Sequence, residues 1–475
     1  MLNTLNDALN NIDNFIWGMP LIVLILFTGI LLTVRLRGLQ VRHLGKALHY
    51  VFHNEDDGEG EVTSFGALCT ALSATIGTGN IVGCATAIVA GGPGALFWMW
   101  LAAFFGMATK YAEGMLAVKY RVIAEDGHAL GGPFYYIEKG MGKNFKWLAK
   151  LFCVFGTMVG LFGIGTFTQV NGITSAVNNF FDPSNVHTIS LFGMNYSISV
   201  VVAGIIVTVC AGLVIIGGIK RISKVSEVIV PFMAVTYIGV CLIIVFTHLP
   251  QVPAAFVQIV QSAFGLKAAA GGAIGAMTVA MQKGIARGIF SNEAGLGSAP
   301  IAAAAAQTNE PVRQGLVSMT GTFIDTIIVC TMTGLAIVMT GAWDMGLEGV
   351  AVTTKAFALG LPFPAKASAF ILMMCLVFFA FTTILGWAYY SERCLEYLVN
   401  GKKFVITAFK WLYILAVFIG PFMTVSAVWT IADICNGLMA FPNLVALLAL
   451  NGDVVSETRG YLERVGIVKT TVGEA

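Results

Sequence analysis

The stretch Ser73-Ala74-Thr75-Ile76-Gly77-Thr78-Gly79-Asn80 lies inside an apolar segment, residues 63–90, that is long enough to cross a membrane. A second glycine-rich stretch, Gly271-Gly272-Ala273-Ile274-Gly275-Ala276-Met277, opens another such segment at 270–305. Glycine in a helix interior costs about 1 kcal/mol relative to alanine, and polar side chains within a membrane add to the cost unless they face protein or water. Close packing through small residues is one explanation. Paired breaks in two helices are the explanation we favour, because such interruptions mark binding sites at the middle of the membrane.

The composition of the whole chain supports a membrane protein. Of its 475 residues, 57% are hydrophobic and 11% are charged, against roughly 25% charged residues in soluble domains. The 27 Lys and Arg residues nearly balance the 25 Asp and Glu residues, which argues against nucleic acid as a partner. The nine cysteines are scattered singly through apolar segments, so we expect neither a disulfide framework nor a zinc site.

The sequence predicts eleven membrane-spanning segments of about 20 or more apolar residues. The N-terminal one has no preceding Lys or Arg, so we interpret it as a retained span with the N-terminus outside and not as a signal peptide. Most Lys and Arg residues then fall on cytoplasmic connections, as the positive-inside rule requires. The C-terminus is predicted to be cytoplasmic. The segments are 16–34, 63–90, 94–118, 148–178, 198–219, 226–247, 270–305, 314–341, 366–397, 404–424 and 427–450.

After the first segment, the other ten divide into two sets of five with nearly equal length. An odd number of spans in each half gives the halves opposite orientations, which is the arrangement of an inverted repeat. The two glycine-rich stretches then occupy the opening helix of each half. The predicted organisation is an N-terminal helix and loop at 1–62, repeats at 63–249 and 268–450, a connection at 250–267 and a tail at 451–475.

Four stretches resemble one known family. They are ATIGTGNIVGCATAIVAGGPGALFWMW at 74–100, FFGMATKYAEGMLAVKYR at 104–121, GIFSNEAGLGSAPIAAAAA at 288–306 and IADICNGLMAFPNL at 431–444. The chain resembles the alanine or glycine:cation symporters, also called sodium:alanine symporters. The resemblance implies an all-α fold of the leucine-transporter type: one extra N-terminal helix, then a five-plus-five inverted repeat with discontinuous opening helices. It also implies the cell (inner) membrane of a prokaryote.

The resemblance implies roles for the first glycine-rich stretch. The backbone amides of Gly77, Thr78 and Gly79, with the hydroxyl of Thr75, are expected to bind a substrate carboxylate, since free N–H groups at a helix start favour an anion. Asn80 and the carbonyls of Ser73 and Ile76 are expected to coordinate sodium. On this hypothesis Gly79→Ala abolishes substrate binding, because a methyl group intrudes where the ligand approaches the chain.

Further residues are expected at the same site. The resemblance gives Thr382 and Thr383 a second sodium site; bonding of each hydroxyl to a carbonyl one turn earlier is the alternative. Gln169 is predicted to accept from a substrate ammonium group, the alternative being a hydrogen bond between helices. Phe167 and the second glycine-rich stretch are expected to line the substrate, and the residues of that stretch are Ala273, Ile274, Gly275, Ala276 and Met277.

Several charged residues lie within the predicted spans. Lys110 and Glu113 are three apart, so one helix face could pair them. Asp325 and Asp433 are single carboxylates in apolar surroundings, where an acid is either functional or satisfied structurally. The charged side chains Lys283, Arg287 and Glu293 either line a cytoplasmic exit or pair with one another.

The predicted function is sodium-driven symport of alanine or glycine by alternating access. Another neutral amino acid, such as glutamine or serine, and coupling to protons are the alternatives. An intramembrane enzyme is disfavoured because all six His residues fall in loops or at span ends and no nucleophile with a base is evident. A channel is disfavoured because no filter-like repeat is present. The expected partners are the substrate, sodium and lipid, with no organic cofactor.

Overall fold

The computed structural model describes residues 2–53, 58–124, 127–191, 194–266, 272–423 and 426–466, and it describes the side chains of these residues except those of 2–5, 191 and 426–429. Nearly all of these residues are helical. An apolar chain in a membrane must satisfy its backbone hydrogen bonds internally, and a helix does so within one segment.

The first half of the chain contains twelve α-helices, three short helical segments and four strands in its described part. The elements are α1 (Leu2–Ile16), α2 (Met19–Arg35), α3 (Leu39–Arg42), α4 (Leu44–Phe52), α5 (Ser64–Thr75), the π-helix η1 (Gly79–Gly83), α6 (Cys84–Gly91), α7 (Gly94–Lys119), β1 (Val122–Ile123), β2 (Ala129–Leu130), α8 (Pro133–Tyr136), η2 (Ile137–Met141), η3 (Lys143–Phe145), α9 (Lys146–Phe162), α10 (Phe167–Phe181), β3 (Thr188–Leu191), β4 (Met194–Ser197), α11 (Ile198–Ile215) and α12 (Gly218–Thr247).

In the described part of the second half, the named elements are all helices, joined by turns and loops. Its elements are η4 (Leu249–Gln251), α13 (Val252–Ala263), α14 (Ala273–Asn292), α15 (Ala299–Ala303), α16 (Pro311–Thr322), the π-helix η5 (Phe323–Cys330), α17 (Thr331–Thr340), η6 (Ala342–Asp344), α18 (Val350–Gly360), α19 (Ala365–Leu398), α20 (Lys403–Ile419), η7 (Gly420–Phe422), α21 (Ser426–Ala449) and α22 (Asn451–Arg464).

Eight helical segments among the described residues are long and apolar enough to cross a membrane, and a ninth is the bent pair of α5 with η1 and α6. Two more helices, α7 and α14, occupy predicted spans at 94–118 and 270–305. They contain 26 and 20 residues, so at 1.5 Å per residue each is about 30 Å long or longer. They are long enough to cross but less apolar than the others.

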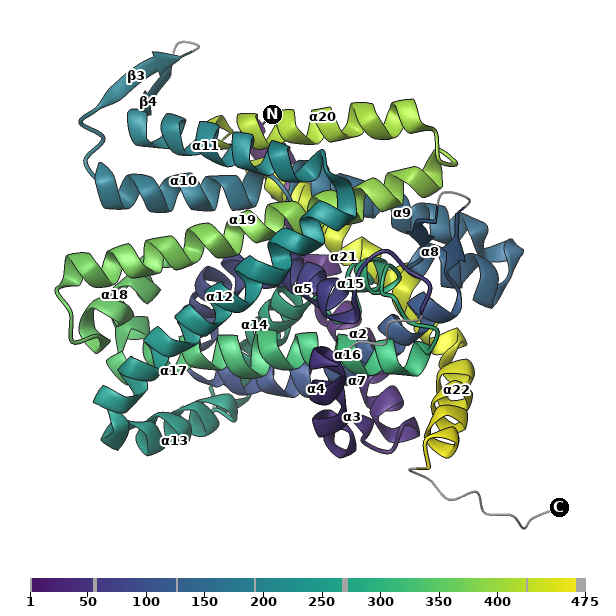
Figure 1. Ribbon diagram of the computed structural model, residues 1–475. Helices are drawn as coiled ribbons and strands as arrows, with labels where there is room; N and C mark the ends of the chain where they lie inside the picture. The colour runs from purple at the N-terminus through teal and green to yellow at the C-terminus, as the bar shows by residue number, and fades with distance from the viewer. Residues whose placement is uncertain are drawn as a thin grey trace.

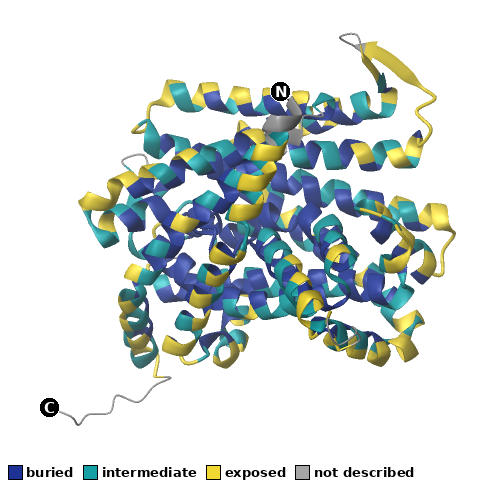
Figure 2. Ribbon diagram, turned by 180° about the vertical axis from the view of Figure 1, so that it is seen from behind, coloured by how far each residue is buried: buried dark blue, intermediate teal, exposed yellow. Residues whose placement is uncertain are grey.

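The long helices run side by side across the view of Figure 1, with α10, α11 and α20 on one side of the bundle and α7, α16 and α17 on the other. The β3–β4 hairpin projects at one end, and α8 and α22 lie at the opposite end. Buried residues fill the centre and exposed ones lie outside (Figure 2). Many of the exposed residues are large and apolar, as on α11 and α12, which fits a surface that faces lipid.

One predicted span is divided. The segment at 148–178 forms α9 and α10, which are separated by Gly163–Thr166. A Cβ atom on Gly163 would overlap the side chain of Ala432 in α21. The close approach of α21 explains why glycine stands here, and the interruption lies just before Phe167 and Gln169.

Two loop segments at the α22 end of the molecule are bonded to each other through their backbones, for example from the Gln307 N–H to Val62 O at 2.7 Å, and both are also bound by the Arg121 side chain. Its Nη1 atom donates to the carbonyls of Ala304 and Ala306 at 3.0 and 2.6 Å, and its Nη2 atom donates to those of Glu59 and Thr308 at 2.6 and 2.7 Å. The segment before α5 is thereby joined to the segment after α15.

Candidate functional site

The first predicted helix break is present. α5 ends at Thr75, the π-helix η1 begins at Gly79, and the two helical parts are bent by 53°. The Gly77 N–H donates to Asn80 Oδ1 at 2.9 Å, while the Thr78 N–H has no hydrogen-bond partner among the described residues. A free peptide N–H at a helix start attracts an anion. The Thr78 N–H is therefore free to bind a ligand, whereas the Gly77 N–H is already bonded to the Asn80 side chain.

Side chains from two other helices converge on Gly77. A Cβ atom on Gly77 would overlap Thr383 Oγ1 of α19 and lie 3.5 Å from Gln169 Oε1 of α10. Thr383 Oγ1 donates to Phe379 O at 3.0 Å and lies 3.5 Å from Ile76 O. Gln169 is 2% exposed, and its Oε1 atom has no hydrogen-bond partner in the described part of the chain. Because a buried amide oxygen without a partner is costly, Gln169 can gain a hydrogen bond from a ligand.

Only one member of the predicted threonine pair faces the break. The Thr382 hydroxyl donates to Phe378 O at 3.2 Å and Phe379 O at 3.0 Å, and lies 3.6 Å from Met233 Sδ of α12. Successive helical residues point about 100° apart, so the two hydroxyls have different neighbours. The Thr383 hydroxyl is the one that lies beside Ile76 O, and the sodium role expected for the pair stays a prediction.

Two hydroxyls of α5 bond back to their own helix. Ser73 Oγ donates to Thr70 O at 2.7 Å, and Thr75 Oγ1 donates to Ala71 O at 3.2 Å. Such bonds are ordinary for Ser and Thr within helices. Ser73 lies in the last turn of α5 and Ile76 directly follows the helix, and the sodium role of their carbonyls stays a prediction. The Thr75 hydroxyl, expected at the substrate carboxylate, here donates within its own helix.

Thr78 and Phe167 pack beside the break on the α10 side. The Thr78 methyl group would lie 3.1 Å from a Cβ atom on Gly172 of α10, so it fills the space that this glycine leaves. Phe167 is 6% exposed and lies against Gly420, the first residue of η7. Thr78 thus contributes its backbone to the break, and Phe167 borders the interruption between α9 and α10.

The second break is not where the glycine pattern placed it. α14 begins at Ala273 and continues to Asn292, and Gly271 lies outside the described residues. A Cβ atom on Gly79 would lie 3.5 Å from the Cα of Ser291, near the far end of α14. Ile274 is about 25 Å from Ser291 at 1.5 Å per residue. The first turns of α14 therefore lie far from the first break. The substrate role stays a prediction, which this geometry does not support, for Ala273, Ile274, Gly275, Ala276 and Met277.

The chain is interrupted instead after Asn292. Glu293, Gly295 and Gly297 have positive φ angles of 56°, 89° and 82°, and α15 begins at Ala299. Two of these left-handed positions carry glycine, which adopts them without a Cβ penalty. The second break thus lies within the stretch at 288–306 that carried the family resemblance. It does not lie in the glycine-rich stretch that precedes it.

Buried carboxylates hold the second break in place. Glu113 Oε1 of α7 accepts from the Gly295 N–H at 3.1 Å and from Asn443 Nδ2 of α21 at 2.7 Å. Glu293 accepts from Trp387 Nε1 of α19 at 3.0 Å. Both acids are therefore bonded to neighbouring helices or backbone. One expectation was that Glu293 pairs with Lys283 or Arg287 of α14, and the structure does not show that pairing among the described residues.

A polar network joins the two breaks. Asn80 Nδ2 donates to Asp325 Oδ1 at 2.7 Å, and Ser291 Oγ and Thr326 Oγ1 donate to Asp325 Oδ2 at 2.9 and 2.7 Å. Asn80 and Asp325 lie in the π-helices η1 and η5, a local geometry that is frequent at functional sites. From the sequence the role of Asp325 stays open, and Ser291 carries no signal of its own. The lone carboxylate in an apolar span is the feature that points to this network.

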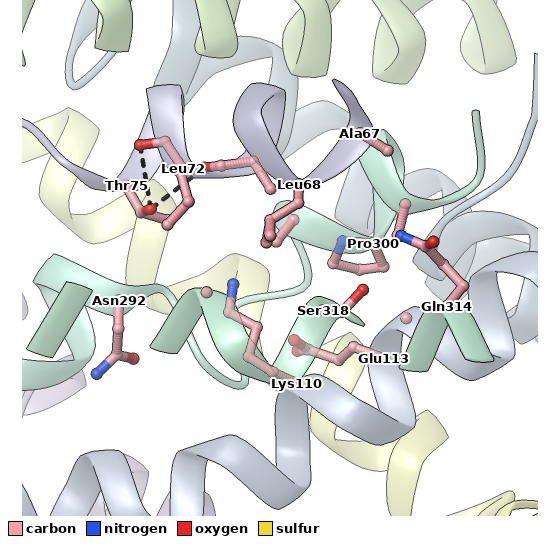
Figure 3. Close-up of a pocket in the computed structure, with 15 residues that line it drawn as sticks. Ala67, Leu68, Leu72, Thr75, Lys110, Glu113, Asn292, Pro300, Gln314 and Ser318 are labelled. Carbon is pink, nitrogen blue, oxygen red and sulfur yellow. Dashed lines mark hydrogen bonds between the residues drawn. The ribbon is translucent and has the colours of Figure 1, made fainter. Parts of the chain in front are cut away.

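A small cavity of about 20 Å³ lies beside this network, enough for about one water molecule. Figure 3 shows Lys110 directed from α7 toward α5, with Glu113 beside it and Asn292 at one side. Among the described residues, Lys110 Nζ, Glu113 Oε2 and Gln314 Oε1 are buried without hydrogen-bond partners. The predicted Lys110–Glu113 ion pair is thus not formed, and the three groups face one cavity together with Thr75.

Comparison with known proteins places the chain in one family. The model of the sodium:alanine symporter family matches residues 2–472. An uncharacterized transporter of Haemophilus influenzae is 55% identical, with 98% of each chain covered. The sodium/alanine symporter AgcS of Methanococcus maripaludis is 45% identical, with 96% of this chain and 97% of that protein covered.

Two further matches concern a second kind of substrate in this family and the fold of the chain. The probable sodium/glutamine symporter GlnT of Bacillus subtilis is 38% identical, with 94% of this chain and 89% of that protein covered. The crystal structure of MhsT in complex with L-phenylalanine has a TM-score of 0.55 at 12% identity, with 84% of this chain and 93% of that chain covered. This likeness shows a leucine-transporter-type fold. The chain therefore belongs to the sodium:alanine symporter family and is a multi-pass membrane transporter, not an enzyme.

Proposed function

We propose that the chain carries a small neutral amino acid, alanine or glycine first, together with sodium into the cell. The observation that supports this proposal most directly is the pair of unused groups at the first break. Gln169 Oε1 is a buried acceptor without a partner, and the Thr78 N–H is a donor without a partner among the described residues. An amino acid supplies an ammonium donor and a carboxylate acceptor. The substrate ammonium then binds Gln169, and its carboxylate binds Thr78.

The size of the site favours a small side chain. Thr383 Oγ1 approaches Gly77 so closely that no Cβ fits at this position, with Gln169 in ordinary contact, and Phe290 and Ser291 of α14 stand beside Gly79. Glutamine is the second candidate, because the relative GlnT is named a probable sodium/glutamine symporter. AgcS, the more similar of the two relatives, is named a sodium/alanine symporter.

The proposed sodium site uses oxygens at the end of α5. Ile76 O and Thr383 Oγ1 lie 3.5 Å apart, and hard oxygen ligands suit a hard cation. Asn80 Oδ1 accepts from the Gly77 N–H and has a second lone pair for an ion, while its Nδ2 donates to Asp325. Its role in this proposal is to connect the break with the Asp325 network. Sodium and substrate then bind next to each other, so each raises the affinity for the other.

The proposed architecture is eleven spans, with the N-terminus outside, the C-terminus in the cytoplasm, and an inverted repeat at 63–249 and 268–450. On this architecture the breaks at Ile76–Thr78 and Glu293–Ser298 belong to the opening helices of the two halves. Alternating access then proceeds by rocking of one group of helices about a site at the middle of the membrane.

Uptake of labelled alanine into proteoliposomes tests the proposal. We expect accumulation when sodium is higher outside, and none when choline replaces sodium at constant pH. Competition by unlabelled glycine and glutamine ranks the candidates, with glycine expected to compete better than glutamine. Uptake that is unchanged in choline and follows a proton gradient would overturn sodium coupling.

A further inference from the structure

A second cavity, of about 360 Å³, lies between the N-terminal helix α1 and the helices α14 and α21. A small-molecule site commonly has a volume of about 300–1,000 Å³, so this cavity has room for an amino acid. Its charged residues are Asp13 of α1, Lys283 and Arg287 of α14, and Asp433 of α21. It shares no residue with the cavity beside Lys110 and lies outside the group around Gly77.

The four charges that line this cavity do not pair directly. Among the described residues, no ion pair within 4.0 Å involves Asp13, Lys283, Arg287 or Asp433. Asp13 Oδ1 is buried without a hydrogen-bond partner. Arg287 acts electrostatically on both carboxylates from a longer distance. Two cations and two anions at the wall of one cavity leave charge of both signs available to a ligand.

The shape of α14 places the cations on one face. Gln282, Lys283, Ala286, Arg287 and Phe290 all line the cavity, and their spacing is that of one stripe along a helix. The carboxylates stand on the other two helices. The backbone carbonyl of Asp433 also accepts from Trp17 Nε1 at 3.0 Å, which fixes the chain after α1 against α21. Cations therefore lie on one wall of the cavity and acids on the opposite walls.

Phe290 connects this cavity to the first break. The Arg287 guanidinium lies over the Phe290 ring at 5.6 Å, and the same ring would lie 3.5 Å from a Cβ atom on Gly79. Phe290 therefore lines the charged cavity and also lies beside the first break.

We propose that the cavity between α1, α14 and α21 is a second binding site for a zwitterionic amino acid, on the route to the first break. This inference rests on the proposed function. The ligand carboxylate binds Arg287 and Lys283, and its ammonium group binds Asp13 and Asp433. A simple anion gains the cations but meets two carboxylates, and a simple cation meets Arg287 and Lys283. Only a ligand with both charges satisfies both walls, since charge-assisted hydrogen bonds are about twice as strong as neutral ones.

Equilibrium binding of labelled alanine to the purified full-length protein in sodium tests the site. We expect two molecules of alanine per chain in the wild type. Arg287→Gln and Asp433→Asn are each expected to weaken one of the two sites by about tenfold or more, the loss expected for a charge-assisted hydrogen bond. Gln169→Ala is expected to remove the other site. Lys220→Gln, an exposed cation at the start of α12, is the matched control and should bind two.

Competition on the Gln169→Ala protein identifies the ligand class. Propionate lacks the ammonium group and alaninamide lacks the carboxylate, so each is expected to compete at least about tenfold less well than alanine. Equal competition by propionate would make the cavity an anion site and overturn the proposal. Asp13→Asn on α1 replaces Arg287→Gln if that variant elutes as aggregate in size-exclusion chromatography.

Failure of this inference differs from failure of the proposed function. If the cavity binds nothing, the wild type binds one alanine that Gln169→Ala removes and Arg287→Gln leaves unchanged. If the chain does not carry neutral amino acids, no variant binds alanine and the proteoliposomes accumulate none, which overturns both proposals.

Discussion

Gly77 and Gly79 lie two residues apart but have different surroundings. A Cβ on Gly77 overlaps Thr383 Oγ1, whereas a Cβ on Gly79 meets Phe290 and Ser291 at an ordinary 3.5 Å. We therefore expect Gly77→Ala to reduce alanine uptake by at least about tenfold, because overpacking costs about 1–3 kcal/mol. Gly79→Ala is expected to retain uptake, which reverses the expectation from the sequence. Uptake by protein that elutes as a single species is the measurement, and equal activities of the two variants would contradict this account.

The threonine pair gives a second comparison at the residue scale. Thr383→Val is expected to raise the sodium concentration for half-maximal uptake by roughly tenfold, because it removes a hydroxyl that stands beside Ile76 O. Thr382→Val is the matched control, since its hydroxyl bonds within α19 and faces Met233. Sodium activation curves of both variants decide the matter. A shift in Thr382→Val as large as in Thr383→Val would remove Thr383 from the sodium site.

Among the elements, the broken end of α14 depends on a carboxylate of another helix. Glu113 Oε1 accepts from Gly295 and Asn443. Glu113→Gln replaces a charged acceptor by a neutral one, so we expect a loss of about 1–2 kcal/mol in stability and a lower melting temperature in detergent. Glu463→Gln, in an exposed pair with Arg459 on α22, should change the melting temperature little. Equal melting temperatures for the two variants would argue against this anchoring role.

The β3–β4 hairpin is tied to the end of α10 by Asp182. The Val186 N–H, followed by the His187 N–H and the Ser197 hydroxyl, stabilises the ionised carboxylate and lowers the pKa of Asp182 below its usual value. Because the pKa is lower in the folded protein than in a free aspartate, the ionised carboxylate stabilises the fold at a pH above the pKa of the free group. This stabilisation is lost as the pH falls through the lower pKa of the folded protein. We expect hydrogen-exchange protection of Val186 and His187 at pH 7, less protection in strong acid, and loss in Asp182→Ala. Unchanged protection in Asp182→Ala would contradict this.

The sequence predicted one helix break correctly and misplaced the other for a physical reason. At 73–80, glycines stand beside Thr78 and Asn80, and the polar groups need partners that a continuous helix cannot supply. At 271–277, glycine stands among apolar residues, and nothing there prevents a helix from forming. At 291–298 the decisive features are left-handed φ angles and carboxylates that bond across helices. Such partners become visible only when distant segments are packed together.

One side chain of the site could be predicted from the sequence, whereas the contacts of others could not. Gln169 was identified as a site residue, and its free buried oxygen next to Gly77 fits that hypothesis. The link from Asn80 to Asp325 spans 245 positions of sequence, and the sequence pattern alone cannot show which residues meet across such a separation. Which member of the Thr382–Thr383 pair faces the break depends on the rotation of α19, and adjacent identical residues give no sign of it.

For the molecule as a whole, the proposed coupling predicts transport of charge. A zwitterion that enters with one sodium ion carries one positive charge inward. An inside-negative potential of about 100 mV contributes roughly 2.3 kcal/mol per charge, which corresponds to about 50-fold accumulation. We expect potassium–valinomycin potentials to accelerate alanine uptake and currents to appear on solid-supported membranes. Uptake that does not respond to the potential would contradict net transfer of one charge per cycle.

The contacts of Arg121 constrain how the molecule can change shape. Its guanidinium binds carbonyl oxygens of two segments, at Glu59 before α5 and at Ala304, Ala306 and Thr308 after α15. A guanidinium stays protonated at any ordinary pH, so acid or base cannot release these four bonds. Any motion that parts the two segments must therefore break all the bonds to one of them. A motion that keeps these bonds must move the end of α7, the start of α5 and the end of α15 together as one rigid body. Bending is then possible only at or beyond the breaks at Ile76–Thr78 and Glu293–Ser298.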